Sequence, residues 1–236
     1  MAFEYLERNV ALTRERMKNA AIAAGRNPDG VQLIAAVKYA DAAEIDALCH
    51  RCGVTAIGEN RVQQLLEHYE QIDLSDVELH FIGTLQTNKV KYIIDKVTMI
   101  HSLDSLKLAA EIDRQAKKHG LVMDVLVEVN CGEEASKSGL YPSEVEAFCL
   151  ELEQFSSINL RGFMTMAPKC EKKDDYLKYF SQTYAQVLDI WTKKLHNIGR
   201  PILSMGMSES FEEAIACGSD MVRVGRSLFV KENESI

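Results

Sequence analysis

The fold of this chain is decided by the stretch Val31-Gln32-Leu33-Ile34-Ala35-Ala36-Val37-Lys38. An almost wholly apolar run of this length predicts a buried strand of a parallel sheet, and the lysine closes the run at its carboxyl end. We expect the Lys38 amine to be partly desolvated there, which favours the neutral, nucleophilic form that attacks carbonyl groups. An ordinary surface lysine is the alternative that this stretch leaves open.

The same kind of run recurs along the whole chain. Apolar, β-branched runs lie at 31–37, 54–57, 79–82, 97–100, 122–129, 158–164, 201–204 and 220–224, and segments with helical periodicity separate them. Eight strand candidates that alternate with helical segments predict parallel β-α units.

Two closures of such units are possible, an open doubly wound sheet and a closed barrel. Eight units within 236 residues match the usual size of a (β/α)₈ barrel, and no G-x-G-x-x-G follows the first strand, as a dinucleotide-binding sheet would require. We therefore predict an α/β protein with one domain over residues 1–236, a (β/α)₈ TIM barrel. An extra amphipathic helix should precede it and stop near Gly25 and Pro28.

Three helix starts can be predicted from capping residues. Asp41-x-x-Glu44 has the spacing of a capping box just after Lys38, and Asp104 is a candidate N-cap for the helix over 108–116. Ser210-x-x-Glu213 has the same capping-box spacing.

Composition excludes several classes of function. Lys+Arg 27 against Asp+Glu 35 gives a net charge of −8, which argues against nucleic acid or an anionic membrane as the main partner. No apolar stretch approaches the roughly 18 residues of a membrane helix, and the charged N-terminus does not resemble a signal peptide. We expect a cytoplasmic protein.

Six scattered cysteines do not form a disulfide framework. Cys49-His50-Arg51-Cys52 has C-x-x-C spacing, but it lies near the end of a helical pattern and lacks a second pair that could complete a zinc site. We interpret the cysteines as structural thiols.

A candidate anion site follows the last two strands, where barrels of this class commonly hold phosphate. The first loop is Ser204-Met205-Gly206-Met207-Ser208, and the second is Gly225-Arg226-Ser227. Hydroxyls, glycines and backbone N–H groups there suit a phosphate. Alternatively, the serines serve only the start of the next helix, and the acidic Glu209, Glu212 and Glu213 oppose a dianion.

Arg223 lies inside the eighth strand candidate, where a charged group needs a polar partner or a ligand. A salt bridge to Glu128 of a neighbouring strand is the structural alternative. An amine that forms a Schiff base and a phosphate site across the barrel mouth together fit pyridoxal 5′-phosphate (PLP), a cofactor that an arginine can tune. An arginine beside the ring nitrogen keeps it unprotonated and makes the cofactor a weaker electron sink.

Several motifs, spread in order over nearly the whole chain, resemble the pyridoxal phosphate homeostasis protein family. They are 31–38, 57–63, His80-Phe81-Ile82-Gly83-Thr84-Leu85-Gln86-Thr87-Asn88-Lys89, Val129-Asn130 with 136–139, 161–168, Ser204-Met205-Gly206-Met207-Ser208 and 222–229. The resemblance implies a barrel like the N-terminal domain of alanine racemase, with PLP held on one lysine.

Site residues follow from the resemblance position by position. Lys38 would carry the cofactor, and Asn60 and Ser102 would lie near the ring. Arg223 would face the ring nitrogen. Ser204, Ser208, Gly225 and Arg226 would form the phosphate cradle, and Met207 would also bind the cofactor. The chain departs from the family pattern at Val37, Arg226 and Val230, where Ser or Thr, Thr and Gly are usual.

Three functions remain open at this stage. The first is a PLP carrier that buffers the cofactor, passes it to apo-enzymes and shows no strong turnover; such a protein would be a monomer, because the dimer-forming domain of racemases is not expected. The second is a small PLP-dependent racemase that uses His80, Tyr39 or a cysteine as the second acid/base. The third is a Schiff-base aldolase without a cofactor.

Overall fold

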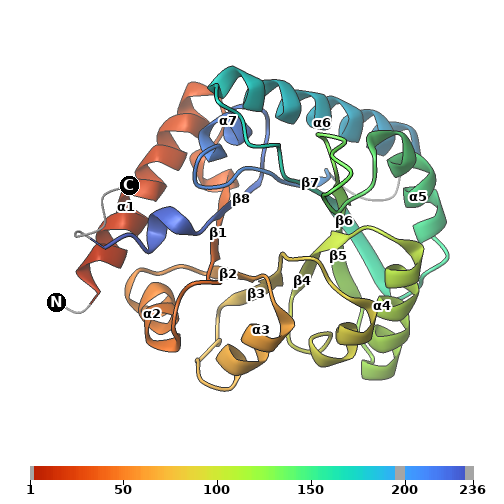
Figure 1. Ribbon diagram of the computed structural model, residues 1–236, viewed down its shortest axis with the longest axis horizontal. Helices are drawn as coiled ribbons and strands as arrows, with labels where there is room; N and C mark the ends of the chain where they lie inside the picture. Colours follow the sequence, from red (N-terminus) through yellow and green to blue (C-terminus); the bar gives the residue numbers. More distant parts are fainter. Residues whose placement is uncertain (1–2, 195–199, 232–236) are drawn as a thin grey trace.

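The computed structural model describes residues 3–194 and 200–231 and shows a closed barrel with strand order β1-β2-β3-β4-β5-β6-β7-β8 (Figure 1). All strand pairs are parallel. The strands are β1 Gln32–Ala36, β2 Ala56–Glu59, β3 Glu78–Phe81, β4 Met99–Leu103, β5 Met123–Val129, β6 Ile158–Thr165, β7 Ile202–Ser204 and β8 Met221–Val224. Each overlaps one predicted run, so the predicted (β/α)₈ fold is confirmed.

Helices surround the barrel. They are α1 Glu4–Ala23, α2 Ala42–Asp46, α3 Val62–Tyr69, α4 Leu106–His119, α5 Val145–Leu152, α6 Lys173–Lys194 and α7 Phe211–Ala216. Short 3₁₀ turns replace an α-helix between β3 and β4, at Thr87–Tyr92, and after β8, at Arg226–Leu228. The helical positions of the eight-unit pattern are therefore occupied, although two of them hold only short turns.

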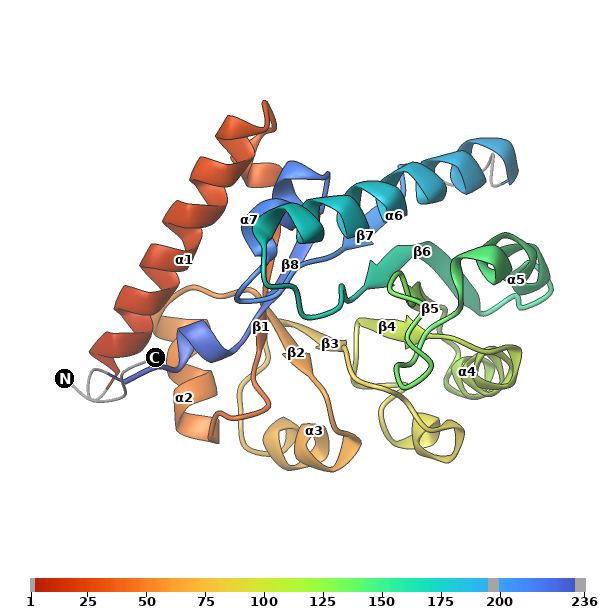
Figure 2. The same ribbon diagram turned by 45° about the horizontal axis from the view of Figure 1, so that its top comes forward.

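The predicted extra helix is α1, which packs against α7 on the outside of the barrel (Figures 1 and 2). The buried Asn9 of α1 donates hydrogen bonds to the carbonyls of Leu228 and Val230, both at 3.0 Å. These bonds join the two ends of the described chain beside the β1–β8 seam, the pair of strands at which the barrel closes. In the described residues, no helix is long and apolar enough to cross a membrane.

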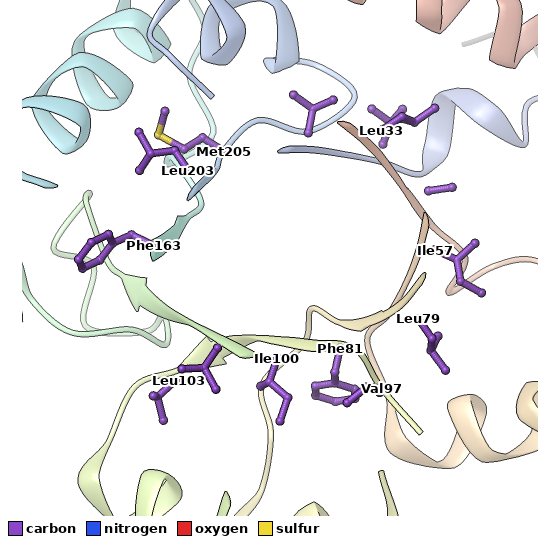
Figure 3. Packing of buried hydrophobic residues seen from close by; sticks show 14 of the residues in the cluster. Leu33, Ile57, Leu79, Phe81, Val97, Ile100, Leu103, Phe163, Leu203 and Met205 are labelled. Carbon is purple, nitrogen blue, oxygen red and sulfur yellow. The ribbon is translucent and has the colours of Figure 1, made fainter. Parts of the chain in front are cut away.

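Alternation along each strand divides the core into two layers. One set of apolar side chains points away from the barrel axis toward the helices, as Leu33, Ile57, Phe81, Ile100 and Phe163 do in Figure 3. The other set fills the barrel interior: Ile34, Ala36, Ala56, Ile82, Met99, Leu126, Met164 and Met221. The inner layer also contains the polar groups described below.

Helix starts agree with the capping predictions at one position out of three. The Asp41–Glu44 capping box is formed, with Glu44 N donating to Asp41 Oδ1 at 2.8 Å. Asp104 as the N-cap of α4 is wrong, because Ser105 caps that helix and accepts from Leu108 N. The Ser210 capping box is also wrong. The Ser210 hydroxyl makes no capping bond to α7 and instead accepts from Met207 N in the preceding loop.

Candidate functional site

A cavity of about 600 Å³ opens at the carboxyl ends of the strands, the face on which barrels of this class place their sites. Its wall includes seven of the predicted site residues: Lys38, Asn60, Met207, Ser208, Arg223, Gly225 and Arg226. The sequence therefore identified residues that are far apart in the chain and meet at one cavity.

Lys38 stands on the rim of this cavity. The strand β1 ends at Ala36, and the chain then turns, with Ala40 N donating to the Val37 carbonyl at 2.9 Å. Lys38 is consequently exposed, and its amine lies 5.0 Å from the centre of the Tyr39 ring. The expected desolvation of this amine is wrong for the protein by itself, because the turn carries the side chain beyond the buried part of the strand.

Gly225 brings the end of β8 against the end of β1. A Cβ at this position would lie 3.0 Å from the Ala36 carbonyl oxygen and 3.2 Å from the Ala36 Cβ. Only a residue without a side chain allows this approach without displacement. The close contact places the loop after β8 directly beside Lys38.

The loop after β7 is held in place by its own polar groups. The Ser208 hydroxyl accepts from Gly225 N at 3.4 Å, which joins this loop to the one after β8. Gly206 has φ +90, and a Cβ there would lie 2.6 Å from the Ala214 Cβ. Met207, which is 39% exposed, lies on the cavity rim.

The acidic residues near this loop are each paired with a cation. Glu209 binds Arg226 at 3.1 Å, and Glu212 binds Arg16 at 3.0 Å. Glu213 lies 3.1 Å from the amine of Lys173. These pairs reduce the repulsion that unpaired carboxylates would exert on an anion in the cavity.

The cavity wall is strongly basic, although the chain is acidic overall. Among the residues that line it, the cations are Lys38, Lys137, Lys169, Arg223 and Arg226, and Glu209 supplies the acidic side chain. Lys137 is paired with Glu134 at 3.0 Å, and Arg226 with Glu209, in positions open to water. The local charge favours an anionic ligand, such as one that carries a phosphate.

Arg223 forms part of the cavity wall from inside the barrel and is only 4% exposed. Its Nη1 donates to the carbonyl and the hydroxyl of Ser204, both at 2.7 Å, and its Nη2 donates to the Thr165 carbonyl at 2.8 Å. Burial lowers the pKa of this guanidinium to about 10, so the group still carries its charge at neutral pH. Its position is fixed by protein atoms before any ligand arrives.

The alternative interpretation of Arg223, a salt bridge to Glu128, receives little support. The described ion pairs do not include it, although the charge of Arg223 acts on Glu128. Burial and the nearby Asp104 raise the pKa of Glu128 to about 7, and Arg223 opposes that rise. Glu128 is therefore a second buried titratable group near the cavity floor.

Three other predicted residues have distinct surroundings. Asn60 follows β2 at the cavity wall, and its Oδ1 is buried without a hydrogen-bond partner. Ser102 lies in β4, fully buried, also with an unpartnered hydroxyl, and it is not part of the cavity wall described here. Ser204 lies beneath Arg223 and likewise does not line the cavity. The predicted cofactor contacts of all three stay predictions.

Two loops contribute to the site without having been given a role from the sequence. Ser136, Lys137 and Ser138 follow β5, and Pro168 and Lys169 follow β6; all five line the cavity. All of these residues except Lys169 lie within stretches that carry the family resemblance. Their position in those motifs was the signal that could have indicated a role at the site.

Redox and metal chemistry find no support among the described residues. The cysteines are free, and burial raises the pKa of Cys49 to about 11, which disfavours a reactive thiolate. The described part of the chain contains no group of three His, Cys, Asp or Glu that could hold a metal ion. The C-x-x-C segment, in Ala47–Arg51 and Cys52, is consistent with structural thiols.

Comparison with known proteins places this chain in a family. The model of the alanine racemase N-terminal domain matches residues 4–232. Proteins named pyridoxal phosphate homeostasis protein match nearly end to end: the one from Aquifex aeolicus is 40% identical over 91% of this chain and 93% of its own, and the one from Pseudomonas aeruginosa is 35% identical over 94% and 93%. The chain belongs to the pyridoxal phosphate homeostasis protein family.

Solved structures resemble this homeostasis-family protein to different extents. PipY of Synechococcus elongatus PCC7942, determined with PLP bound, has a TM-score of 0.83 at 29% identity and covers 95% of this chain and 100% of its own. An alanine racemase of Clostridium difficile 630 has a TM-score of 0.73 at 20% identity, and only 58% of its chain is covered. The second likeness shows the fold alone.

Proposed function

We propose that this protein holds PLP reversibly on Lys38, buffers the free cofactor and passes it to apo-enzymes, without strong catalytic turnover. The observation that carries the proposal is one cavity that brings together an accessible lysine amine, a buried guanidinium and the hydroxyl and glycine of the last two loops. The PLP-bound structure of PipY supports it.

The residues present fit the cofactor. The unpartnered Oδ1 of Asn60 is a buried acceptor in the cavity wall and can receive a hydrogen bond from a ligand. A guanidinium carries five N–H donors, and Arg223 uses its two Nη groups to bind protein atoms, which leaves N–H groups for the cavity. Ser208, Gly225 and Arg226 supply donors for a phosphate at the adjoining loops.

Each side chain then has a definite task. When bound, PLP supplies an aldehyde that a lysine amine can hold covalently and a ring that withdraws electrons. Lys38 provides the amine, and its place on the open rim allows the cofactor to enter and leave. Arg223 directs N–H donors at the ring nitrogen and, because it keeps its own proton, leaves that nitrogen unprotonated.

A racemase is the second function, and the cavity wall disfavours it. His80 is 1% exposed in the barrel interior and does not line the cavity, and the cysteines do not line it either. Tyr39 does, but it is 71% exposed, next to Lys38 in the chain and beside its amine. A second base that works on the opposite face of an amino acid is thus lacking among these predicted candidates.

The test is borohydride reduction of the protein incubated with PLP, followed by peptide mapping. We expect one modified lysine, Lys38, and transfer of unreduced PLP to an apo-enzyme, measured as recovered activity of that enzyme. Modification at another lysine would refute the assigned site. Rapid exchange of L- and D-amino acids would favour the racemase instead.

A further inference from the structure

A chain of side-chain hydrogen bonds crosses the barrel interior from Arg223 to the opposite end. Arg223 Nη1 lies 2.7 Å from Ser204 Oγ, which lies 3.2 Å from His101 Nδ1. His101 Nε2 lies 2.8 Å from His80 Nδ1, and His80 Nε2 lies 3.2 Å from Glu78 Oε2. We call these five residues, contributed by β8, β7, β4 and β3, the polar relay.

The two ends of the polar relay face different surroundings. Glu78 is the first residue of β3, so it lies at the amino ends of the strands, and its side chain is 53% exposed. His80, His101 and Ser204 are at most 1% exposed, and Arg223 lines the cavity. The relay therefore connects solvent at the closed end of the barrel with the floor of the cavity at the other end.

Chemistry at both ends restricts where the hydrogens lie. Arg223 can only donate, so Ser204 Oγ accepts from it. Hydrogen bonds from His80 and Gln32 lower the pKa of Glu78 to about 2, so this carboxylate accepts and His80 Nε2 carries a hydrogen. Burial, together with the charges of His80 and Arg223, holds the pKa of His101 well below its usual value, so His101 carries a single ring proton.

These restrictions leave two arrangements. With His80 neutral, the Ser204 hydroxyl donates to His101 Nδ1, and His101 Nε2–H donates to His80 Nδ1. With one more proton on His80, His80 Nδ1–H donates to His101 Nε2, and His101 Nδ1–H donates to Ser204 Oγ. The second arrangement reverses both bonds, so that Ser204 Oγ receives hydrogens from both His101 and Arg223.

We propose that the polar relay couples proton uptake at His80 to the hydrogen bonding of Arg223, so that His80, His101 and Ser204 are positioning residues for the guanidinium at the cavity floor. Its effect on a bound cofactor rests on the proposed PLP function. The device would let acidity at the far end of the barrel adjust how firmly the group facing the ring nitrogen is held.

Other charges reach the same groups. Glu128 from β5 is coupled to Arg223 and to Asp104, which follows β4. Glu59 of β2 is bound to His68 of α3 and takes no part in the relay bonds. The test therefore changes Glu78, which lies farthest from Arg223, and leaves Glu128 and Asp104 in place.

The first experiment uses the protein without ligand, labelled with ¹⁵N in histidine and arginine, and follows ring and guanidinium resonances with pH. We expect His101 to change from the Nε2–H to the Nδ1–H form together with the change at His80, and the Arg223 resonances to follow. Glu78→Gln should alter this coupled change, because the carboxylate that accepts from His80 Nε2 is replaced by a neutral amide. Glu67→Gln, on an exposed carboxylate of α3, should leave it unchanged.

Ser204→Ala tests whether the response of Arg223 passes through the Ser204 hydroxyl or arises only because the histidines lie nearby. The two histidines should still change form together, but the Arg223 resonances should no longer follow them. Independent behaviour of the two rings, or an Arg223 response that survives Ser204→Ala, would overturn the proposal.

The second experiment records the absorbance of bound PLP against pH. Glu78→Gln should change the pH dependence of that spectrum, and Glu67→Gln should not. A pH dependence that is the same in Glu78→Gln and in the unmodified protein would overturn the coupling to the cofactor site. Failure of the unmodified protein to bind PLP would instead refute the proposed function, and the ligand-free spectra would still decide whether the relay operates.

Discussion

The cavity rim and the barrel interior both hold polar side chains, but they hold them in opposite ways. On the rim, Lys38 and Arg226 are exposed and make few contacts that fix them. In the interior, Arg223 and the histidines are buried and bonded to one another. The difference separates two tasks. The rim residues are available to a ligand and contribute little to stability, whereas the interior residues orient the Arg223 guanidinium, whose burial as a charged group is unfavourable.

The sharpest test of this division is Lys38→Ala. Because the side chain is exposed, we expect covalent retention of PLP to be lost while the free energy of unfolding changes by less than about 0.5 kcal/mol. Absorbance of the bound cofactor and urea unfolding measure the two quantities. Lys169→Ala removes another exposed lysine of the same cavity wall and should keep the cofactor; equal losses in both variants would contradict the assignment.

Arg223→Gln should affect both quantities. The change leaves the Thr165 and Ser204 carbonyls without their donor, and we expect the free energy of unfolding to fall by about 3 kcal/mol, together with weaker PLP binding. Arg226→Gln is the matched control, because its side chain is 77% exposed and should change stability little. If Arg223→Gln leaves stability as unaltered as Arg226→Gln does, the hydrogen bonds of Arg223 do not stabilise the barrel interior.

Glu128→Gln tests the electrostatic part of the comparison. The pKa of Glu128 is raised from its ordinary value of 4.5 to about 7, so the folded protein binds this proton more tightly than the unfolded chain. Its contribution to stability is present below about pH 4.5 and is lost as the pH rises to about 7, a difference of about 3 kcal/mol.

Glu128→Gln should remove that slope and stabilise the protein at pH 8. Urea unfolding at pH 5 and pH 8 gives the difference, with Glu153→Gln, on an exposed carboxylate, as the control. An identical pH dependence in the unmodified protein and Glu128→Gln would show that Glu128 ionises normally.

The smallest effect is expected for Ser208→Ala. The hydroxyl accepts from Gly225 N at 3.4 Å, a long bond, and a ligand phosphate would be one more partner. We expect the dissociation constant of PLP to rise by about fivefold, equivalent to roughly 1 kcal/mol, with no change in the free energy of unfolding. Equilibrium titration of the cofactor measures this; unchanged binding would remove Ser208 from the cradle.

The repeating pattern of the sequence predicted the fold well, because each of the eight strands overlaps one of the apolar, β-branched runs. The same pattern placed Lys38, Arg223 and Gly225 at one face, since the carboxyl ends of parallel strands lie together. Local contacts were harder to predict. Asp104 and Ser105 are both good N-caps, and only the three-dimensional path of the chain selects Ser105.

Interior geometry could not be obtained from the sequence at all. His80 and His101 lie on the neighbouring strands β3 and β4, but the contact between their rings depends on the three-dimensional curvature of the barrel, which periodicity does not show. The exposure of Lys38 was mispredicted for a similar reason: a strand pattern does not show that the chain leaves the sheet after Ala36. Periodicity indicates which face a residue occupies, but not how far from the strand end its side chain stands.

The seam between β1 and β8 has a consequence for biosynthesis. Lys38 is made well before Gly225, yet the Ala36–Gly225 contact and the pairing of Ile34 with Arg223 bring the two strand ends together. A nascent chain that lacks its eighth strand has the amine but neither the guanidinium nor the loop beside it. Under the proposed function, PLP can be held on both sides only after the barrel has closed, and a bound molecule would connect the first strand to the eighth.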